Sequence, residues 1–201
     1  MAETLYASVC GSLESTNATY STAVAGSNLS VLGSGIIITG QDNAPNTIWV
    51  SYIAFDLTSY APGGDAASPT LSLYLSSGPW NVTHTMNVRA YDFGTSVTTA
   101  DWVASGGPGG TLLAHRLSTG VGAGYNAFTD DAMAAAIEAN MGGTLRLWIG
   151  TSAHEAQTSN NGNTIWVGGT GSANAPKLVF TYTAPVSSVR DPVGMLGFFG
   201  S

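Results

Sequence analysis

Apolar and polar residues alternate most clearly in two stretches, residues 52–57 (YIAFDL) and residues 71–75 (LSLYL). Successive side chains of a β-strand point to opposite faces, so this alternation predicts strands with one buried face and one face toward solvent. The loop between the two stretches contains Pro62, Gly63 and Gly64, residue types that favour turns. The order of strand, turn and strand predicts an antiparallel β-protein rather than a helical one.

Eight stretches have the composition of strands, and turn residues separate them. They are Ile36–Thr39, Ile48–Leu57, Thr70–Leu75, Met86–Asp92, Thr111–Leu117, Thr144–Gly150, Thr164–Val167 and Lys177–Thr183. The side chains expected on buried faces are Ile53, Phe55 and Leu57; Leu71, Leu73 and Leu75; Leu145, Leu147 and Ile149; and Leu178, Phe180 and Tyr182. About eight such strands predict an all-β fold, a two-sheet antiparallel β-sandwich of the jelly-roll type.

One segment, residues 130–141, has helical periodicity instead. Its apolar stripe consists of Met133, Ile137 and Met141. Thr129 is the expected N-cap, and Asp130 and Asp131 suit the positive end of the helix dipole. Gly142 follows as a stop. We expect one short helix that caps an open end of the sandwich.

The chain divides into three parts by composition. Residues 1–35 are rich in Ser, Thr, Ala and Gly, and we expect an irregular, partly extended N-terminal arm. Residues 36–184 are expected to form the jelly roll, and residues 185–201 a linker with an apolar C-terminal tail. The tail residues expected to dock on a partner are Val193, Met195, Leu196, Phe198 and Phe199. Since an exposed apolar segment is costly in water, the alternative is that this tail folds back onto its own sandwich.

Charged residues are rare in this chain of 201 residues. They make up 8% of it, against about 25% in a typical domain. The polar surface must therefore consist of Ser, Thr, Asn, Gly and backbone groups, which suits contact with other proteins or glycans. The formal net charge of −7 argues against a nucleic-acid partner. We expect no signal peptide and no membrane contact, since no apolar run approaches the roughly 20 residues of a span.

No motif of catalytic chemistry is recognisable in the sequence. The three histidines lack metal-ligand spacing, and no Gly-x-Ser-x-Gly elbow occurs. His154 and Glu155 are expected in a solvated loop. Asp130 and Asp131 are a candidate calcium site, although EF-hand spacing is absent. We therefore expect no enzyme activity, no catalytic residues and no cofactor.

Two tryptophans are candidates for glycan stacking. Trp80 follows a Gly-Pro pair in a loop, and Trp148 alternates with Leu147 and Ile149, so it faces away from the buried side of its strand. An exposed indole ring beside polar groups can stack on a sugar ring. The alternative is that these rings pack under loops or at a subunit interface.

Several motifs, taken in order, resemble the DNRLRE-type jelly-roll domains, which are carbohydrate-binding-module-like. These motifs are residues 51–58 (SYIAFDLT), 67–75 (ASPTLSLYL), 87–94 (NVRAYDFG) with 99–103 (TADWV), and 176–182 (PKLVFTY). The resemblance implies a jelly roll over roughly residues 36–183 with no catalytic residues to carry over. Relatives of this kind occur as accessory modules of secreted carbohydrate-active enzymes and look similar to virion proteins of tailed phages.

These observations together lead to an expected function. We expect a non-enzymatic structural protein of a phage virion, made in the host cytoplasm, that serves as a capsid decoration or head-fibre protein and attaches through its terminal segments. The expected partners are the major capsid protein or neighbouring structural subunits, with a homo-oligomer and a cell-surface glycan as further candidates. The alternatives are a carbohydrate-binding module for glycan adhesion, or a tail or fibre component.

Overall fold

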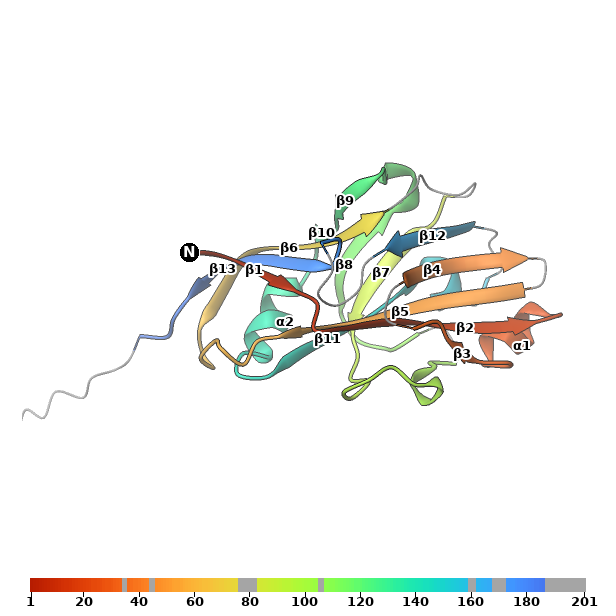
Figure 1. Cartoon of the computed structure of the whole chain (residues 1–201), viewed down its shortest axis with the longest axis horizontal. Coiled ribbons are helices and arrows are strands. Elements are labelled where there is room, and N and C mark those ends of the chain that lie inside the picture. The colour runs from red at the N-terminus through yellow and green to blue at the C-terminus, as the bar shows by residue number, and fades with distance from the viewer. Residues whose placement is uncertain are drawn as a thin grey trace, which may run out of the picture.

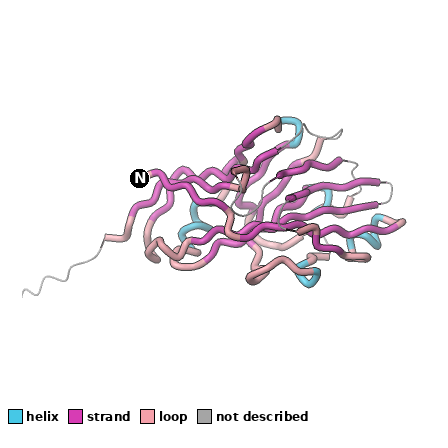
Figure 2. The backbone as a smooth tube through the Cα atoms, viewed as in Figure 1, coloured by secondary structure: helices cyan, strands magenta, loops and turns pink. Residues whose placement is uncertain are grey.

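The protein is an all-β sandwich of two antiparallel sheets, with three short α-helices among the residues that the structure describes (Figures 1 and 2). The computed structural model describes residues 1–33, 36–43, 46–75, 83–104, 107–158, 162–167 and 173–186. The strands are β1 (Ala2–Tyr6), β2 (Val9–Asn17), β3 (Ser30–Val31), β4 (Ile36–Asn43), β5 (Asn46–Asp56), β6 (Asp65–Leu75), β7 (Thr85–Ala90), β8 (Leu112–Leu117), β9 (Gly124–Ala127), β10 (Thr129–Asp130), β11 (Thr144–Thr151), β12 (Gly162–Val167) and β13 (Lys177–Thr183). The α-helices are α1 (Tyr20–Val24), α2 (Met133–Ala139) and α3 (Ser152–Glu155), with 3₁₀ turns at Thr99–Asp101 and Ser118–Gly120.

The strand order is that of a jelly roll. The small sheet has the order β1-β13-β6-β9, and the centre of the large sheet has the order β8-β7-β11-β5. Consecutive strands repeatedly cross between the sheets: β5 lies in the large sheet, β6 in the small sheet, β7 and β8 in the large sheet, and β9 in the small sheet. This interleaving of the small sheet with the four central strands of the large, nine-stranded sheet is the arrangement of the jelly roll that the sequence predicts.

The inter-sheet core contains the side chains that the alternation assigns to it. Its members from β5, β6, β11 and β13 are Ile53, Phe55 and Leu57, Leu71, Leu73 and Leu75, Leu145, Leu147 and Ile149, and Leu178 and Phe180. The apolar stripe of α2, with Met133 and Ile137, completes this core, and Tyr182 is partly buried against it. The predicted inward faces are therefore confirmed.

The N-terminal segment differs from the expected irregular arm. β1 pairs with β13 from Ala2 opposite Thr181 to Tyr6 opposite Lys177, and β2 pairs with β5 over nine residues from Val9 to Asn17. The prediction of an arm was wrong because the apolar alternation of β2 is broken by serines, which are buried by hydrogen bonding instead. The Ser12 hydroxyl lies 3.1 Å from that of Ser51 and accepts a 2.9 Å bond from the Ile38 amide.

The predicted helix begins later than expected. Thr129 and Asp130 form the short strand β10, which pairs with β8, and α2 starts at Met133. The prediction of Thr129 as the N-cap was wrong, because Ala132 occupies that position. The Asp130 carboxylate nevertheless accepts a 2.8 Å hydrogen bond from the Met133 amide at the start of the helix. Gly142 follows the helix with a positive φ of 82°, a conformation that favours glycine.

A second apolar cluster, which we call the outer core, lies on the face of the large sheet that is turned away from the small sheet. Its buried members are Leu13, Val50, Tyr52, Ala54, Phe93 and Trp148. A cover loop, residues 91–104 and 107–111, lies over it and contributes Phe93, Val97 and Trp102. The Tyr52 hydroxyl donates a 2.7 Å hydrogen bond to the Asp101 carbonyl and so ties this loop to β5.

Candidate binding face

The outer face of the small sheet presents tyrosines to solvent, and we call Tyr6, Tyr74, Tyr125 and Lys177 the tyrosine face. Leu5, Leu178 and Leu71 stand opposite one another and point into the core, so the alternate residues Tyr6 and Lys177 point outward. Tyr74 and Tyr125 are likewise paired across β6 and β9. Tyr6 is 56% exposed and Tyr125 is 37% exposed.

The tyrosine face is ordered by contacts among its own side chains. The Lys177 ammonium lies 3.9 Å from the centre of the Tyr125 ring, a cation–π contact. The Tyr74 and Tyr125 rings meet edge to face with their centres 5.3 Å apart. The Tyr125 hydroxyl lies 3.0 Å from the carbonyl oxygens of both Ala173 and Ala175, and its one O–H is shared between them, which ties the segment before β13 to this face. The Tyr6 ring is thereby left as the most accessible of the three.

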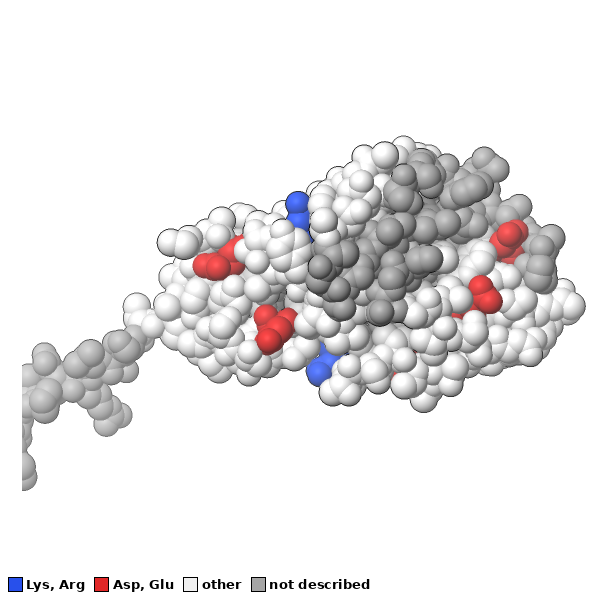
Figure 3. All heavy atoms as spheres, in the orientation of Figure 1, with Lys and Arg blue, Asp and Glu red and all other residues white. Residues whose placement is uncertain are grey.

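The tyrosine face carries one charged side chain, Lys177, and its other three members are uncharged tyrosines. Lys177 forms no ion pair with an acidic side chain of the described residues. Partial burial raises the pKa of Tyr125, and the neighbouring hydroxyls of Tyr6 and Tyr74 raise it further, so the phenol stays protonated at neutral pH. Charge is sparse on the view in Figure 3 as well, where acidic and basic groups stand as isolated spots. Such a face can bind a partner, but it holds no general base or activated nucleophile.

Trp148 does not lie on a surface. It points away from the inter-sheet core, as its alternation predicts, but its side chain is fully buried in the outer core. A methyl group built on Gly107 of the cover loop would come within 2.7 Å of the indole ring. A ring with both faces covered cannot stack on a sugar, so the glycan-stacking prediction for Trp148 was wrong and the alternative of packing under a loop was right. Trp80 lies outside the described residues.

Both residues of the candidate calcium site, Asp130 and Asp131, are engaged in other contacts. The Asp130 carboxylate accepts a hydrogen bond from the Met133 amide, and the Asp131 carboxylate lies 2.7 Å from Nδ1 of His115. Among the described residues, no three His, Cys, Asp or Glu side chains gather as a metal site would require. The tail residues expected to dock on a partner, Val193, Met195, Leu196, Phe198 and Phe199, lie outside the described part of the chain.

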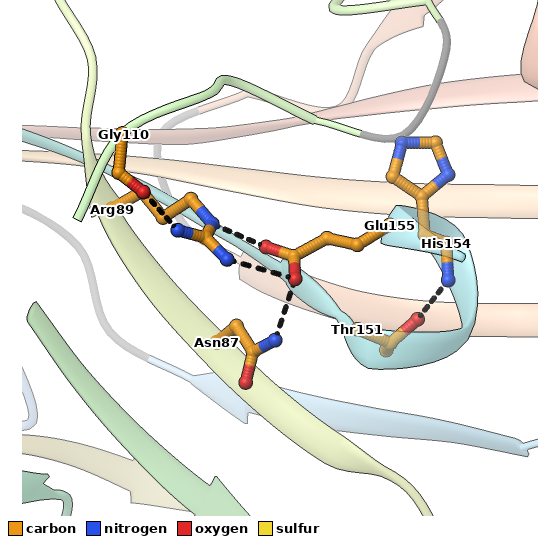
Figure 4. Close-up of polar contacts among 6 residues, drawn as sticks. All are labelled: Asn87, Arg89, Gly110, Thr151, His154 and Glu155. Carbon is orange, nitrogen blue, oxygen red and sulfur yellow. Dashed lines mark hydrogen bonds and ion pairs between the residues drawn. The ribbon is translucent and has the colours of Figure 1, made fainter. Parts of the chain in front are cut away.

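The prediction that His154 and Glu155 lie in a solvated loop was wrong, because both lie in α3 and contact neighbouring elements. Glu155 accepts a two-pronged contact from Arg89, with 2.6 Å between Oε1 and Nε, and a 2.8 Å hydrogen bond from Asn87 (Figure 4). Arg89 also donates to the Gly110 carbonyl, so this cluster joins α3, β7 and the cover loop. The hydrogen bond with Glu155 raises the pKa of Arg89.

The His154 ring points away from the carboxylate of Glu155 (Figure 4). It lies instead near the rings of Trp102 and Trp148, with centres 5.8 and 6.1 Å away. Burial lowers the pKa of His154 to about 4, so the ring is neutral at physiological pH. The contacts of His154, Glu155 and Arg89 therefore hold the cover loop against the large sheet, which is a structural role.

Comparison of the sequence with models of known protein families gives no match, and comparison with curated proteins gives no significant match. Within the described residues, no helix is long and apolar enough to cross a membrane. The geometry of the tyrosine face, rather than a relative, is therefore the basis for a functional proposal.

Proposed function

We propose that this protein is a non-enzymatic structural protein that acts by binding, and specifically a capsid decoration or head-fibre protein of a phage particle. The observation that carries the binding role is the exposed tyrosine face, whose one charged side chain is Lys177. Tyrosine combines a large apolar ring with a polar end, which is why it is enriched at protein interfaces. The motif resemblance and the scarcity of charge support the particle assignment.

Copy number on purified particles tests this proposal. We expect the protein to co-purify with assembled virions at a fixed ratio to the major capsid subunit. A chain truncated after Val186 retains every described strand, so its circular dichroism should be unchanged while its particle occupancy falls. Absence of the full chain from gradient-purified particles would overturn the particle assignment. Unchanged occupancy of the truncated chain would show that the tail is not needed for attachment, and the tyrosine face would then be the proposed attachment surface.

Neutral glycan binding is the second candidate, and the exposure of the Tyr6 ring favours it. An accessible aromatic ring on the face of a sheet can stack on the apolar face of a sugar. A broad glycan panel should then give binding to an uncharged oligosaccharide that the Tyr6→Ser variant loses. The Leu117→Ser variant is a matched control, since Leu117 is 51% exposed and lies on β8 of the other sheet. No binding across the panel would dismiss this candidate without affecting the first.

A further inference from the structure

A groove of about 290 Å³ runs beside α2 and is lined almost entirely by small side chains. On the helix side lie Ala132, Ala135 and Ala136, and on the other side lie Gly109, Gly110 and Thr111 at the end of the cover loop. The hydrogen bond from Arg89 to the Gly110 carbonyl fixes that second wall. Walls of alanine and glycine leave room for larger apolar side chains supplied from elsewhere.

A second, polar hollow of about 170 Å³ adjoins the groove, since Ala90 lines both. Asn140 and Thr144, just beyond the C-terminal end of α2, lie at this hollow. It also carries a loose ion pair, because the Arg146 guanidinium lies 3.6 Å from the Asp92 carboxylate. The side chain of Asp92 remains 80% exposed. The two hollows therefore form one track along α2, polar at the C-terminal end of the helix and apolar at its N-terminal end.

The described part of the chain leads toward the polar end of this track. Tyr182 and Thr183 at the end of β13 converge with Met141 on Gly64, where a methyl group would meet all three within 3.2 Å. Figure 1 shows β13 leaving the sandwich on the side where α2 lies. Val186, the last described residue, is 96% exposed.

The sequence after Val186 matches the track in polarity and in length. Arg190 and Asp191 come first, and the apolar residues from Val193 to Phe199 follow. Six residues lie between Val186 and Val193, and the seven steps from one to the other can span about 23 Å when the chain is extended. The seven residues of α2 are only about 10 Å long. The charged pair can thus reach the polar hollow while the apolar residues reach the groove.

We propose that residues 190–199 of the same chain bind along α2, with Arg190 and Asp191 against Asp92 and Arg146, and with the apolar side chains in the alanine- and glycine-lined groove. Opposite charges would meet at one end and apolar surfaces at the other, so the direction of binding is specified. The groove then holds the tail whenever no partner binds it. This inference goes beyond the proposed function, and it can be tested on the isolated protein without any particle.

Disulfide trapping in the full chain tests the contact directly. Cysteines at Ala135 and Phe198 should form an intramolecular cross-link under mild oxidation, because the native Cys10 is buried and does not compete. We expect the cross-link to form at least about tenfold faster than in a control with cysteines at Leu117 and Phe198. Equal rates would overturn the proposal. A predominantly dimeric product would also overturn it, because a second copy would then be the source of the tail.

Limited digestion with chymotrypsin supplies a second readout that needs no cysteine. The A135E variant places a carboxylate in the groove, whereas the A139E variant places one on an exposed position of α2 that does not line it. Cleavage after Leu196, Phe198 or Phe199 should be about tenfold faster in A135E than in the unmodified chain and unchanged in A139E. Equal cleavage of all three proteins would contradict docking in the groove, whatever the outcome of particle binding.

Discussion

The two outer faces of the sandwich use aromatic residues in opposite ways. On the large sheet, Tyr52 and Trp148 are covered by a loop that brings Phe93 and Trp102 over them, which produces the outer core. On the small sheet no described segment covers Tyr6, and the Tyr125 ring is covered only in part. Aromatic residues directed away from a sandwich core therefore indicate binding only where no other part of the chain returns to cover them.

The largest expected effect concerns the covered face. Replacement of Trp148 by alanine should lower the free energy of unfolding by about 3–5 kcal/mol, because the fully buried indole leaves a cavity between β11 and the cover loop. Urea denaturation followed by circular dichroism measures this. A loss below about 1 kcal/mol would mean that the outer core contributes little, and that the two faces differ less than the structure indicates.

A pH titration addresses the same face. The pKa of His154 falls to about 4 on folding, against about 6.5 in the unfolded chain. Between these values the unfolded state binds more protons, so stability should decline as the pH falls from 6.5 to 4, by at most about 3 kcal/mol. Glu155 beside it opposes part of the shift. The H154Q variant should lose this component of the pH dependence, and identical pH profiles for the two proteins would show that the ring is not buried in the neutral form.

The close approach of glycine to Trp148 predicts a smaller loss. A methyl group on Gly150 would lie 2.0 Å from the indole ring, so G150A should destabilise the fold by about 1–3 kcal/mol through overpacking. Gly122 is the control, since a methyl group there meets nothing within 4 Å and its φ is not positive. Thermal unfolding of both variants compares them. Equal melting temperatures would indicate that the indole does not contact β11 as described.

The smallest effect on stability is expected on the tyrosine face. Y6A removes an exposed ring that has no part in the inter-sheet core, so the free energy of unfolding should change by less than about 0.5 kcal/mol. The same urea titration as for Trp148 gives the value. A loss of more than about 2 kcal/mol in the free energy of unfolding would mean that Tyr6 contributes to packing, and would count against a binding role for it.

Alternation along the chain predicts the sandwich well because strands such as β5, β6, β11 and β13 bury one face against an apolar core. It fails for β2, where Ser12 is buried through hydrogen bonds with neighbouring strands rather than through apolar contact. The side of β11 on which the Trp148 side chain lies could be predicted from its neighbours. Its burial could not, because it depends on a loop that is distant in sequence.

The tyrosine face could not be predicted for a related reason. Tyr74 and Lys177 fall on the outward positions of predicted strands, but Tyr6 belongs to the segment interpreted as an arm, and Tyr125 to a short strand bounded by glycine-rich sequence. Only the pairing of β1 with β13, and of β6 with β9, brings the four side chains to one surface. A local pattern shows which side of a strand is outward, but it does not show which strands become neighbours.

The most direct test of the binding role compares partner occupancy for two variants, each of which replaces a similarly exposed large side chain with serine. Y6S alters the tyrosine face and L117S alters an exposed position of the large sheet, and neither residue belongs to the core clusters. Occupancy on purified particles, measured by quantitative mass spectrometry, should fall at least about tenfold for Y6S, equivalent to about 1.4 kcal/mol of binding free energy, and should be unchanged for L117S. Equal occupancy of the two variants would contradict the assignment of the tyrosine face as the surface through which this protein binds.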